Sequence, residues 1–220
     1  MIQTFGSLNF AVYFGFGYCY LNFVIRLFVG DTMRVLGIDP GTLTSGYGIV
    51  VEEDHKLFHV ASGGISPSAK QPFPMRLKKI YEELEKVIDK YRPQVVVVED
   101  LFVSKNVKSA LKLGHARGVA ILAAMNAGLP VFEYAPLEVK QAVVGNGKAE
   151  KKQVQMMVKA LLDLPKVPHP ADAADALAAA ICHIHCSRLK EILKNSTSLR
   201  MSGRGVSGLR SIGSRGTQAY

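Results

Sequence analysis

The sequence predicts an α/β domain built on a mixed five-stranded sheet flanked by helices. Two observations indicate this class. Three apolar runs come close together between residues 34 and 63, with turn-prone residues between them. Beyond them, apolar runs of strand length alternate with segments in which apolar residues recur at helical spacing. Hairpin strands followed by alternating helices and strands are typical of a mixed sheet.

The first three strands are expected over Arg34 to Ile38, Gly46 to Glu52 and Leu57 to Gly63. Each is a short run rich in apolar residues, and each is bounded by residues that favour turns. The sequence therefore predicts an antiparallel meander for this part of the chain.

A helix is expected over Met75 to Tyr91, because apolar residues recur there every three or four positions. The pair Arg92-Pro93 ends this helix. The run Val95 to Val98 then predicts a strand that is apolar on both faces, as a parallel strand covered by helices requires.

The rest of the chain as far as about Arg188 continues the alternation. A long helix is expected over Lys105 to Asn126 and ends near Gly128, and a fifth strand follows over Leu129 to Glu133. Three further helices complete the prediction: Pro136 to Val144, Glu150 to Leu162 and Pro170 to about Arg188.

Composition is that of a globular protein with a basic surface. The 220 residues are 48% apolar and 20% charged, and the net charge is +9. A polyanionic partner accounts for this charge, and the alternative is a basic surface exposed only to solvent. The three cysteines argue against a disulfide framework and favour a reducing cytosol.

Residues 1–32 differ from the rest, since they carry no charge before Arg26 and are rich in Phe, Tyr and Gly. Three interpretations stay open: a membrane anchor, a signal peptide, or a segment outside the natural protein, whose translation then starts at Met33. The third is favoured, because polar residues and glycines interrupt the apolar stretch. We therefore divide the chain into an extension (1–32), a central patterned domain (33–190) and a basic disordered tail (191–220).

Four carboxylates fall where a site is expected. Asp39 and Glu99 end two predicted strands, and functional sites in open α/β sheets lie at the carboxyl ends of strands. Asp172 and Asp175 share one face of the last helix. Hard cations such as Mg²⁺ take carboxylate oxygens, and two such ions promote displacement at phosphorus. The four acids are predicted to form one metal site that hydrolyses DNA.

Each acid also has a purely structural interpretation. Asp39 is a turn former in Asp-Pro-Gly, and Glu99 is the first solvated residue after a strand. Asp172 and Asp175 favour the positive end of a helix. These interpretations weaken when the four acids are taken together.

The chain resembles the RuvC family of Holliday junction resolvases from residue 33 to about residue 188. The resemblance rests on six motifs in the family's order: Leu36-Gly-Ile-Asp-Pro-Gly-Thr42, Gly46-Tyr-Gly-Ile49, Val98-Glu-Asp-Leu-Phe102, Ser109-Ala-Leu-Lys-Leu-Gly-His-Ala-Arg-Gly118, Val139-Lys140-Gln141 through Gly145, and Ala171-Asp-Ala-Ala-Asp-Ala-Leu-Ala178.

This resemblance implies a ribonuclease H-like fold and a cytoplasmic homodimer with no membrane contact. It implies symmetric, Mg²⁺-dependent nicking of a four-way DNA junction in homologous recombination and DNA repair. Two Mg²⁺ ions per site are expected, with Mn²⁺ as a substitute. The branch-migration motor proteins RuvA and RuvB are the partners that the family implies.

The resemblance also assigns roles to residues. It places the catalytic, metal-binding acids at Asp39, Glu99, Asp172 and Asp175. It also places Phe102 where it stacks on a junction base, and Lys140 and Lys151 at basic positions that contact DNA. Lys148, beside the loop Gly145-Asn-Gly147, and Lys105 are further residues expected to contact DNA. The helix from Lys105 to Asn126 is the expected dimer element, with small residues that permit close approach: Ala110, Gly114, Ala116 and Gly118.

Other patterns are weaker. Cys182, His183, His185 and Cys186 lack a second group at zinc-site spacing, so burial in the helix core is favoured. Three rival functions stay open: a phosphate-loop ATPase of the actin or hexokinase kind, a ribonuclease H-like nuclease acting on precursor RNA or flaps, and an inactive junction-binding protein.

Overall fold

The computed structural model describes residues 32–100 and 107–202. The chain divides into two compact units, Met1–Ile184 and His185–Tyr220. The first unit contains the whole sheet, and the described part of the second is helical.

The sheet has five strands in the order β3-β2-β1-β4-β5. Strands β1 (Met33–Asp39), β2 (Ser45–Glu53) and β3 (Lys56–Ile65) pair antiparallel with their neighbours. Strand β4 (Val95–Glu99) runs parallel to β1, and β5 (Val131–Tyr134) runs parallel to β4. The predicted meander and the mixed five-stranded sheet are therefore confirmed.

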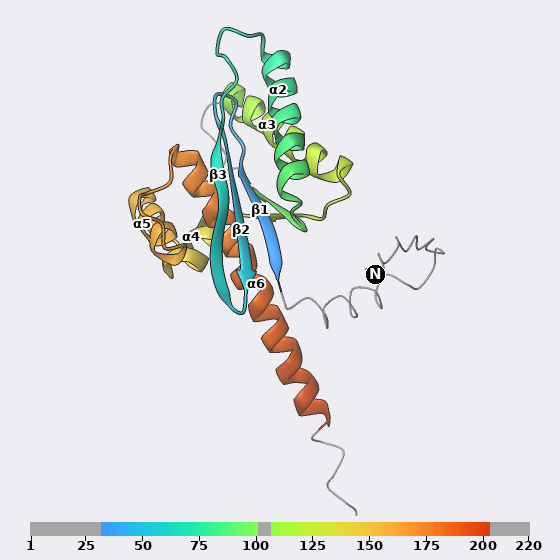
Figure 1. Ribbon diagram of the computed structural model, residues 1–220, viewed down its shortest axis with the longest axis vertical. Helices are drawn as coiled ribbons and strands as arrows, with labels where there is room; N and C mark the ends of the chain where they lie inside the picture. Colours follow the sequence, from blue (N-terminus) through green and yellow to red (C-terminus); the bar gives the residue numbers. More distant parts are fainter. Residues whose placement is uncertain (1–31, 101–106, 203–220) are drawn as a thin grey trace, which may run out of the picture. The chain divides into compact units, whose positions relative to one another are not determined.

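In the described residues, five helices flank or follow the sheet (Figure 1). They are α2 (Phe73–Tyr91), α3 (Val107–Asn126), α4 (Pro136–Val144), α5 (Lys151–Leu161) and α6 (Ala171–Ser202). In Figure 1, α2 and α3 lie on one side of the sheet, whereas α4, α5 and the first turns of α6 lie on the other.

The core on the side of α2 and α3 follows the alternation of side chains along the strands. Leu36 and Ile38 of β1, with Val96 and Val98 of β4, belong to one buried cluster with residues of α2 and α3 such as Ile80. Because neighbouring residues of a strand point to opposite faces, Gly37, Asp39, Val97 and Glu99 face the other side. The sheet therefore turns both strand-end acids toward α6.

The predicted end of the last helix near Arg188 is wrong, because α6 continues to Ser202. Residues 189–202 contain no glycine or proline, and the first glycine after them is Gly203. Nothing in this stretch breaks a helix, since serine and arginine are compatible with one and glycine or proline is what usually ends it.

Among the described residues, none of the helices combines the length and the hydrophobicity that a membrane span needs. Residues 1–31, for which a membrane anchor was one interpretation, lie outside the described part of the chain.

Candidate active site

The site begins at the carboxyl ends of β1 and β4. In the parallel register Ile38 pairs with Val98, so Asp39 and Glu99 are the next residues on adjacent strands. Both side chains face α6 by the alternation described above. The sequence predicted that both acids end strands, and the structure shows that these two strands are neighbours.

Helix α6 reaches the sheet through glycines on the facing strands. A Cβ atom on Gly37 of β1 would overlap the backbone carbonyl of Ala176, and one on Gly46 of β2 would overlap that of Asp172. A Cβ atom on Gly48 would meet the side chain of Leu177 at 2.6 Å. The backbone of α6 therefore packs directly on the backbone of two strands, and this approach carries its acids to the end of β1.

Three of the four predicted acids come together. Asp39, Asp172 and Asp175 each place a carboxylate oxygen within 4.8 Å of the other two. Glu99 lies outside this group, but it interacts electrostatically with Asp39 and Asp175. The structure thus forms a cluster of three acids with the fourth beside it.

The cluster concentrates negative charge in a partly buried place. Burial raises the pKa of Asp39 to about 8, and repulsion from the neighbouring carboxylates adds to the shift. Burial raises the pKa of Glu99 to about 7, again with repulsion from Asp175. The pKa of Asp175 is raised as well, mainly by burial. Mutual repulsion disfavours the ionised form of carboxylates held this close, and a bound cation would remove this repulsion.

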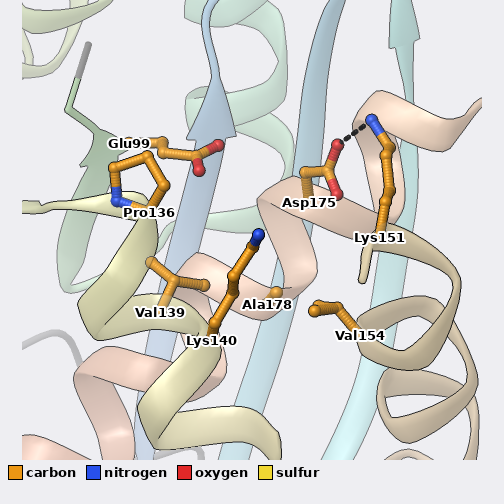
Figure 2. Close-up of a pocket in the computed structure, with 8 residues that line it drawn as sticks. All are labelled: Glu99, Pro136, Val139, Lys140, Lys151, Val154, Asp175 and Ala178. Carbon is orange, nitrogen blue, oxygen red and sulfur yellow. Dashed lines mark ion pairs between the residues drawn. The ribbon is translucent and has the colours of Figure 1, made fainter. Parts of the chain in front are cut away.

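Two lysines reach the same place from α4 and α5, as Figure 2 shows. They line a cavity of about 180 Å³ together with Glu99 and Asp175. The Nζ atom of Lys151 lies 2.5 Å from Oδ2 of Asp175, and Lys140 extends between the two acids in the view of Figure 2. The positive charges of Lys140 and Lys151 both lower the pKa of Glu99.

Ser45 shapes the loop that follows Asp39 and was missed in the sequence. Ser45 is buried, with only 1% of the residue exposed. Its hydroxyl donates to the carbonyl of Gly41 at 2.7 Å and accepts from the N–H of Gly41 at 3.1 Å. These two bonds hold the turn between β1 and β2. A polar residue that opens an apolar strand was the available signal.

Gln141 of α4 holds the loop that carries Lys148. Its side-chain amide donates to the carbonyl of Gly145 at 2.9 Å, and its oxygen accepts from the N–H of Gly147 at 3.1 Å. Lys148 itself is exposed. The structure therefore presents this predicted DNA contact on an ordered loop.

Two predicted DNA contacts, Phe102 and Lys105, lie outside the described residues. The discounted Cys-His pattern is buried only in part. Cys182 is fully buried, and Nδ1 of His183 lies 3.0 Å from the hydroxyl of Tyr134, whereas His185 and Cys186 are half-buried. In the ranges that the structure describes, the aspartate cluster is the one group of three or more acids, histidines or cysteines that could hold a metal ion.

Arg117 of α3 is a second residue that sequence reasoning missed. Its guanidinium lies 3.0 Å from the carboxylate of Asp100 and 2.7 Å from that of Glu133. Asp100 directly follows Glu99, and Glu133 belongs to β5. Arg117 therefore ties the end of β4 to its neighbouring strand and to α3. An arginine in a helix gives no sequence signal for such a bridge.

We expect Arg117→Ala to lower the free energy of unfolding by about 1–2 kcal/mol, because a partly buried arginine loses two carboxylate partners. Urea denaturation measures this change. The matched control is Lys86→Ala, which removes a more exposed ion pair with Glu83 and should lower the free energy of unfolding by less than Arg117→Ala does. Equal losses in the two variants would show that the bridge adds nothing beyond an ordinary surface pair.

The comparisons with known proteins agree with this geometry. The family model described as crossover junction endodeoxyribonuclease RuvC matches residues 35–183. The RuvC of Citrifermentans bemidjiense is 55% identical over 163 residues, which cover 74% of this chain and 99% of that protein. The RuvC of Geobacter sp. strain M21 is 56% identical over 162 residues, which cover 74% of this chain and 98% of that protein.

Solved structures give the same relationship. Thermus thermophilus RuvC in complex with a Holliday junction substrate is similar with a TM-score of 0.68 and 37% identity, and the match covers 72% of this chain and 96% of that one. The yeast mitochondrial Holliday junction resolvase Ydc2 has a TM-score of 0.56 at 16% identity, over 80% of this chain and 91% of that one. This more distant likeness supports the fold alone.

Proposed function

The chain belongs to the RuvC family of crossover junction endodeoxyribonucleases, and from this premise we propose that it resolves four-way DNA junctions. The reaction is the symmetric, Mg²⁺-dependent hydrolysis of two phosphodiester bonds during homologous recombination and DNA repair. The observation that carries the proposal is the aspartate cluster at the end of β1, in a chain that matches the family over residues 35–183.

The residues fit a divalent metal. Their donors are carboxylate oxygens, which Mg²⁺ prefers, and the three aspartates approach within 4.8 Å. Burial, together with repulsion from the neighbouring carboxylates, raises the pKa of Asp39, and a cation would relieve this repulsion. We assign Asp39, Asp172 and Asp175 as ligands and Glu99 as the fourth acid, with two Mg²⁺ ions per site and Mn²⁺ as a substitute. When bound, Mg²⁺ supplies charge that stabilises a reacting phosphate.

The chain's other residues position the DNA backbone. Lys140 lines the cavity beside Glu99, and Lys148 stands on the loop held by Gln141. Ammonium groups at these positions neutralise phosphates and bring the scissile bond to the acids. Binding that depends on such contacts weakens as the salt concentration rises. Phe102 and Lys105 keep their proposed roles as a stacking aromatic and a phosphate contact.

We propose that α3 pairs with α3 of a second copy. Several of its apolar side chains are exposed: Val107, Leu111, Leu122 and Met125. Gly118 has no neighbour within 4 Å of the position that a Cβ atom would take, which leaves room for a partner. Ala116, which the sequence also suggested for this contact, is instead fully buried in the chain's own core. A two-fold dimer presents two equivalent sites to a two-fold junction.

By family resemblance, RuvA and RuvB are the proposed motor partners and the cytoplasm is the proposed location. Residues 33–190 are proposed as the nuclease domain, preceded by an extension (1–32) that is not part of it. The basic segment 191–220 is proposed as an arm that adds nonspecific phosphate contacts. Its first part belongs to helix α6.

The test uses a synthetic four-way junction and a linear duplex of the same sequence, each with Mg²⁺. We expect paired nicks at symmetric positions in the junction, which ligase can reseal, and almost no cutting of the duplex. Chelation with EDTA should stop the reaction, since the acids alone supply no positive charge to the phosphate. Equal cutting of junction and duplex would contradict junction selectivity and favour a general nuclease.

A further inference from the structure

Lys151 contacts Asp175, an acid that is also a proposed ligand of the metal ion. It is the first residue of α5, and its ammonium forms an ion pair with Oδ2 of Asp175. Figure 2 shows the two side chains meeting, and both line the cavity that Glu99 also lines. Asp175 is one of the three aspartates of the cluster. The ammonium of Lys151 therefore lies where its positive charge offsets the negative charge of the cluster.

The charge of Lys151 acts on the whole cluster. It lowers the pKa of Asp39, Glu99 and Asp175, and so opposes the upward shifts that burial and repulsion cause. Burial disfavours the charged form of Lys151, but its hydrogen bond to Asp175 and the surrounding carboxylates leave its pKa raised. The ammonium of Lys151, paired with Asp175, thus offsets part of the negative charge of the cluster.

The ion pair between Lys151 and Asp175 is also placed where it can exchange partners. The side chain of Lys151 is 55% exposed, whereas that of Asp175 is 19% exposed. A lysine is a single charge on a flexible stem, so it exchanges partners at little cost. A divalent cation brings twice the charge to the same carboxylate oxygens, and hard cations take several such oxygens at once. The acid is fixed on α6, and the lysine is the partner that is free to move.

We propose that Lys151 is a resident counter-ion, which occupies Asp175 until a divalent cation binds and then transfers its ammonium to a phosphate of the DNA. This inference deepens the proposed function and rests on it for the identity of the phosphate. Lys151 then has two successive partners, one carboxylate and one phosphate. Its position at the acids and its predicted contact with DNA describe these two states.

The exchange has a thermodynamic consequence. Because Lys151 and the metal compete for Asp175, the lysine weakens metal binding in the protein without DNA. A phosphate that draws the ammonium away removes this competition, so DNA and metal favour each other's binding. Coupling between two ligands is reciprocal, and each strengthens the other by the same factor. The lysine therefore delays loading of the metal until DNA is present.

The experiment measures Mg²⁺ binding by isothermal titration calorimetry to the full chain without DNA. We expect Lys151→Gln to bind Mg²⁺ at least about fivefold more tightly than the unchanged protein, a factor typical of coupled sites. The matched control is Lys152→Gln, which removes the same charge from the next residue of α5. Lys152 is exposed and does not belong to the lining of the cavity, so its removal should leave the affinity nearly unchanged.

Three further measurements distinguish this interpretation from damage to the fold. Lys151→Arg keeps the charge and should bind Mg²⁺ as the unchanged protein does, and circular dichroism verifies that each variant is folded. At saturating Mg²⁺, Lys151→Gln should cut junctions more slowly, because the phosphate loses its lysine. Tighter metal binding with slower cleavage is a combination that damage to the fold does not produce.

Unchanged or weaker Mg²⁺ binding by folded Lys151→Gln would overturn the proposal, as would an equal gain in Lys152→Gln. Failure of the proposed function gives a different result. In that case the unchanged protein does not cut junctions, while the order of Mg²⁺ affinities among the variants still reports on the ion pair.

Discussion

Asp39→Asn should abolish junction cleavage and, in the absence of metal, make the folded protein more stable at pH 8. Asp39 is the strand-end acid that approaches both aspartates of α6, so its loss removes a proposed ligand from the cluster. Loss of a residue that merely supports a ligand costs about 10- to 100-fold in metal affinity or activity, so loss of the ligand itself should cost at least about 100-fold.

The gain in stability follows from the sign of the pKa shift. The pKa of Asp39 is about 8 in the folded chain and 3.8 as a model value, so the folded state binds the extra proton between these values. Stability contributed by this proton is complete below pH 4 and is lost as the pH rises to 8. Asparagine cannot ionise, so the variant should escape this loss and gain about 1–3 kcal/mol at pH 8.

Urea denaturation with EDTA at pH 5 and pH 8 measures this difference, and junction cleavage is followed in parallel with Mg²⁺. The control is Asp89→Asn on α2, which changes an exposed acid far along the chain from the cluster and should affect neither property. Addition of Mg²⁺ should stabilise the unchanged protein more than Asp39→Asn. A variant that loses activity and is also less stable at pH 8 would argue that Asp39 supports the fold.

The part of the site that the sequence revealed is the part that local patterns determine. Asp39 and Glu99 stand at the ends of apolar runs, and the alternation of side chains in a strand fixes the face on which each one lies. The valine run identified β4 as an interior parallel strand. These features need only the spacing of residues along the chain.

The remaining features depend on contacts between distant segments. The ion pairs of Lys151 with Asp175 and of Arg117 with Asp100 join residues on different elements, and no periodicity predicts them. The end of α6 was predicted too early, because a polar composition was taken as disorder although the breaking residues begin only at Gly203. For the ion pairs, the missing information was the identity of the partner residue, which lies on a distant segment. For α6, it was the position of the first helix-breaking residue, Gly203.

Glycines in the sheet are the clearest example, because in the sequence they only weaken a strand. In the structure, Gly46 allows the first turn of α6 to lie against β2, where a Cβ atom would overlap the carbonyl of Asp172. We expect Gly46→Ala to lower the free energy of unfolding by about 3 kcal/mol or more, beyond ordinary overpacking, because helix backbone must move. The same displacement withdraws Asp172 from Asp39, so Mg²⁺ binding and cleavage should fall with it.

The sign of the effect is diagnostic, since alanine in place of glycine within a strand normally stabilises by about 0.5–1 kcal/mol. Gly63→Ala is the matched control on β3, where the atoms nearest to the new Cβ belong to the side chain of Tyr47, with the hydroxyl oxygen at 2.9 Å and two ring carbons at 3.0 Å. A side chain can move more easily than a helix backbone, so this variant should cost only about 1–2 kcal/mol. Thermal denaturation and Mg²⁺ titration of both variants measure the difference. If folded Gly46→Ala binds Mg²⁺ like Gly63→Ala, contact between β2 and α6 does not set the position of Asp172. If it binds more weakly, the close backbone contact at Gly46 is what assembles the site.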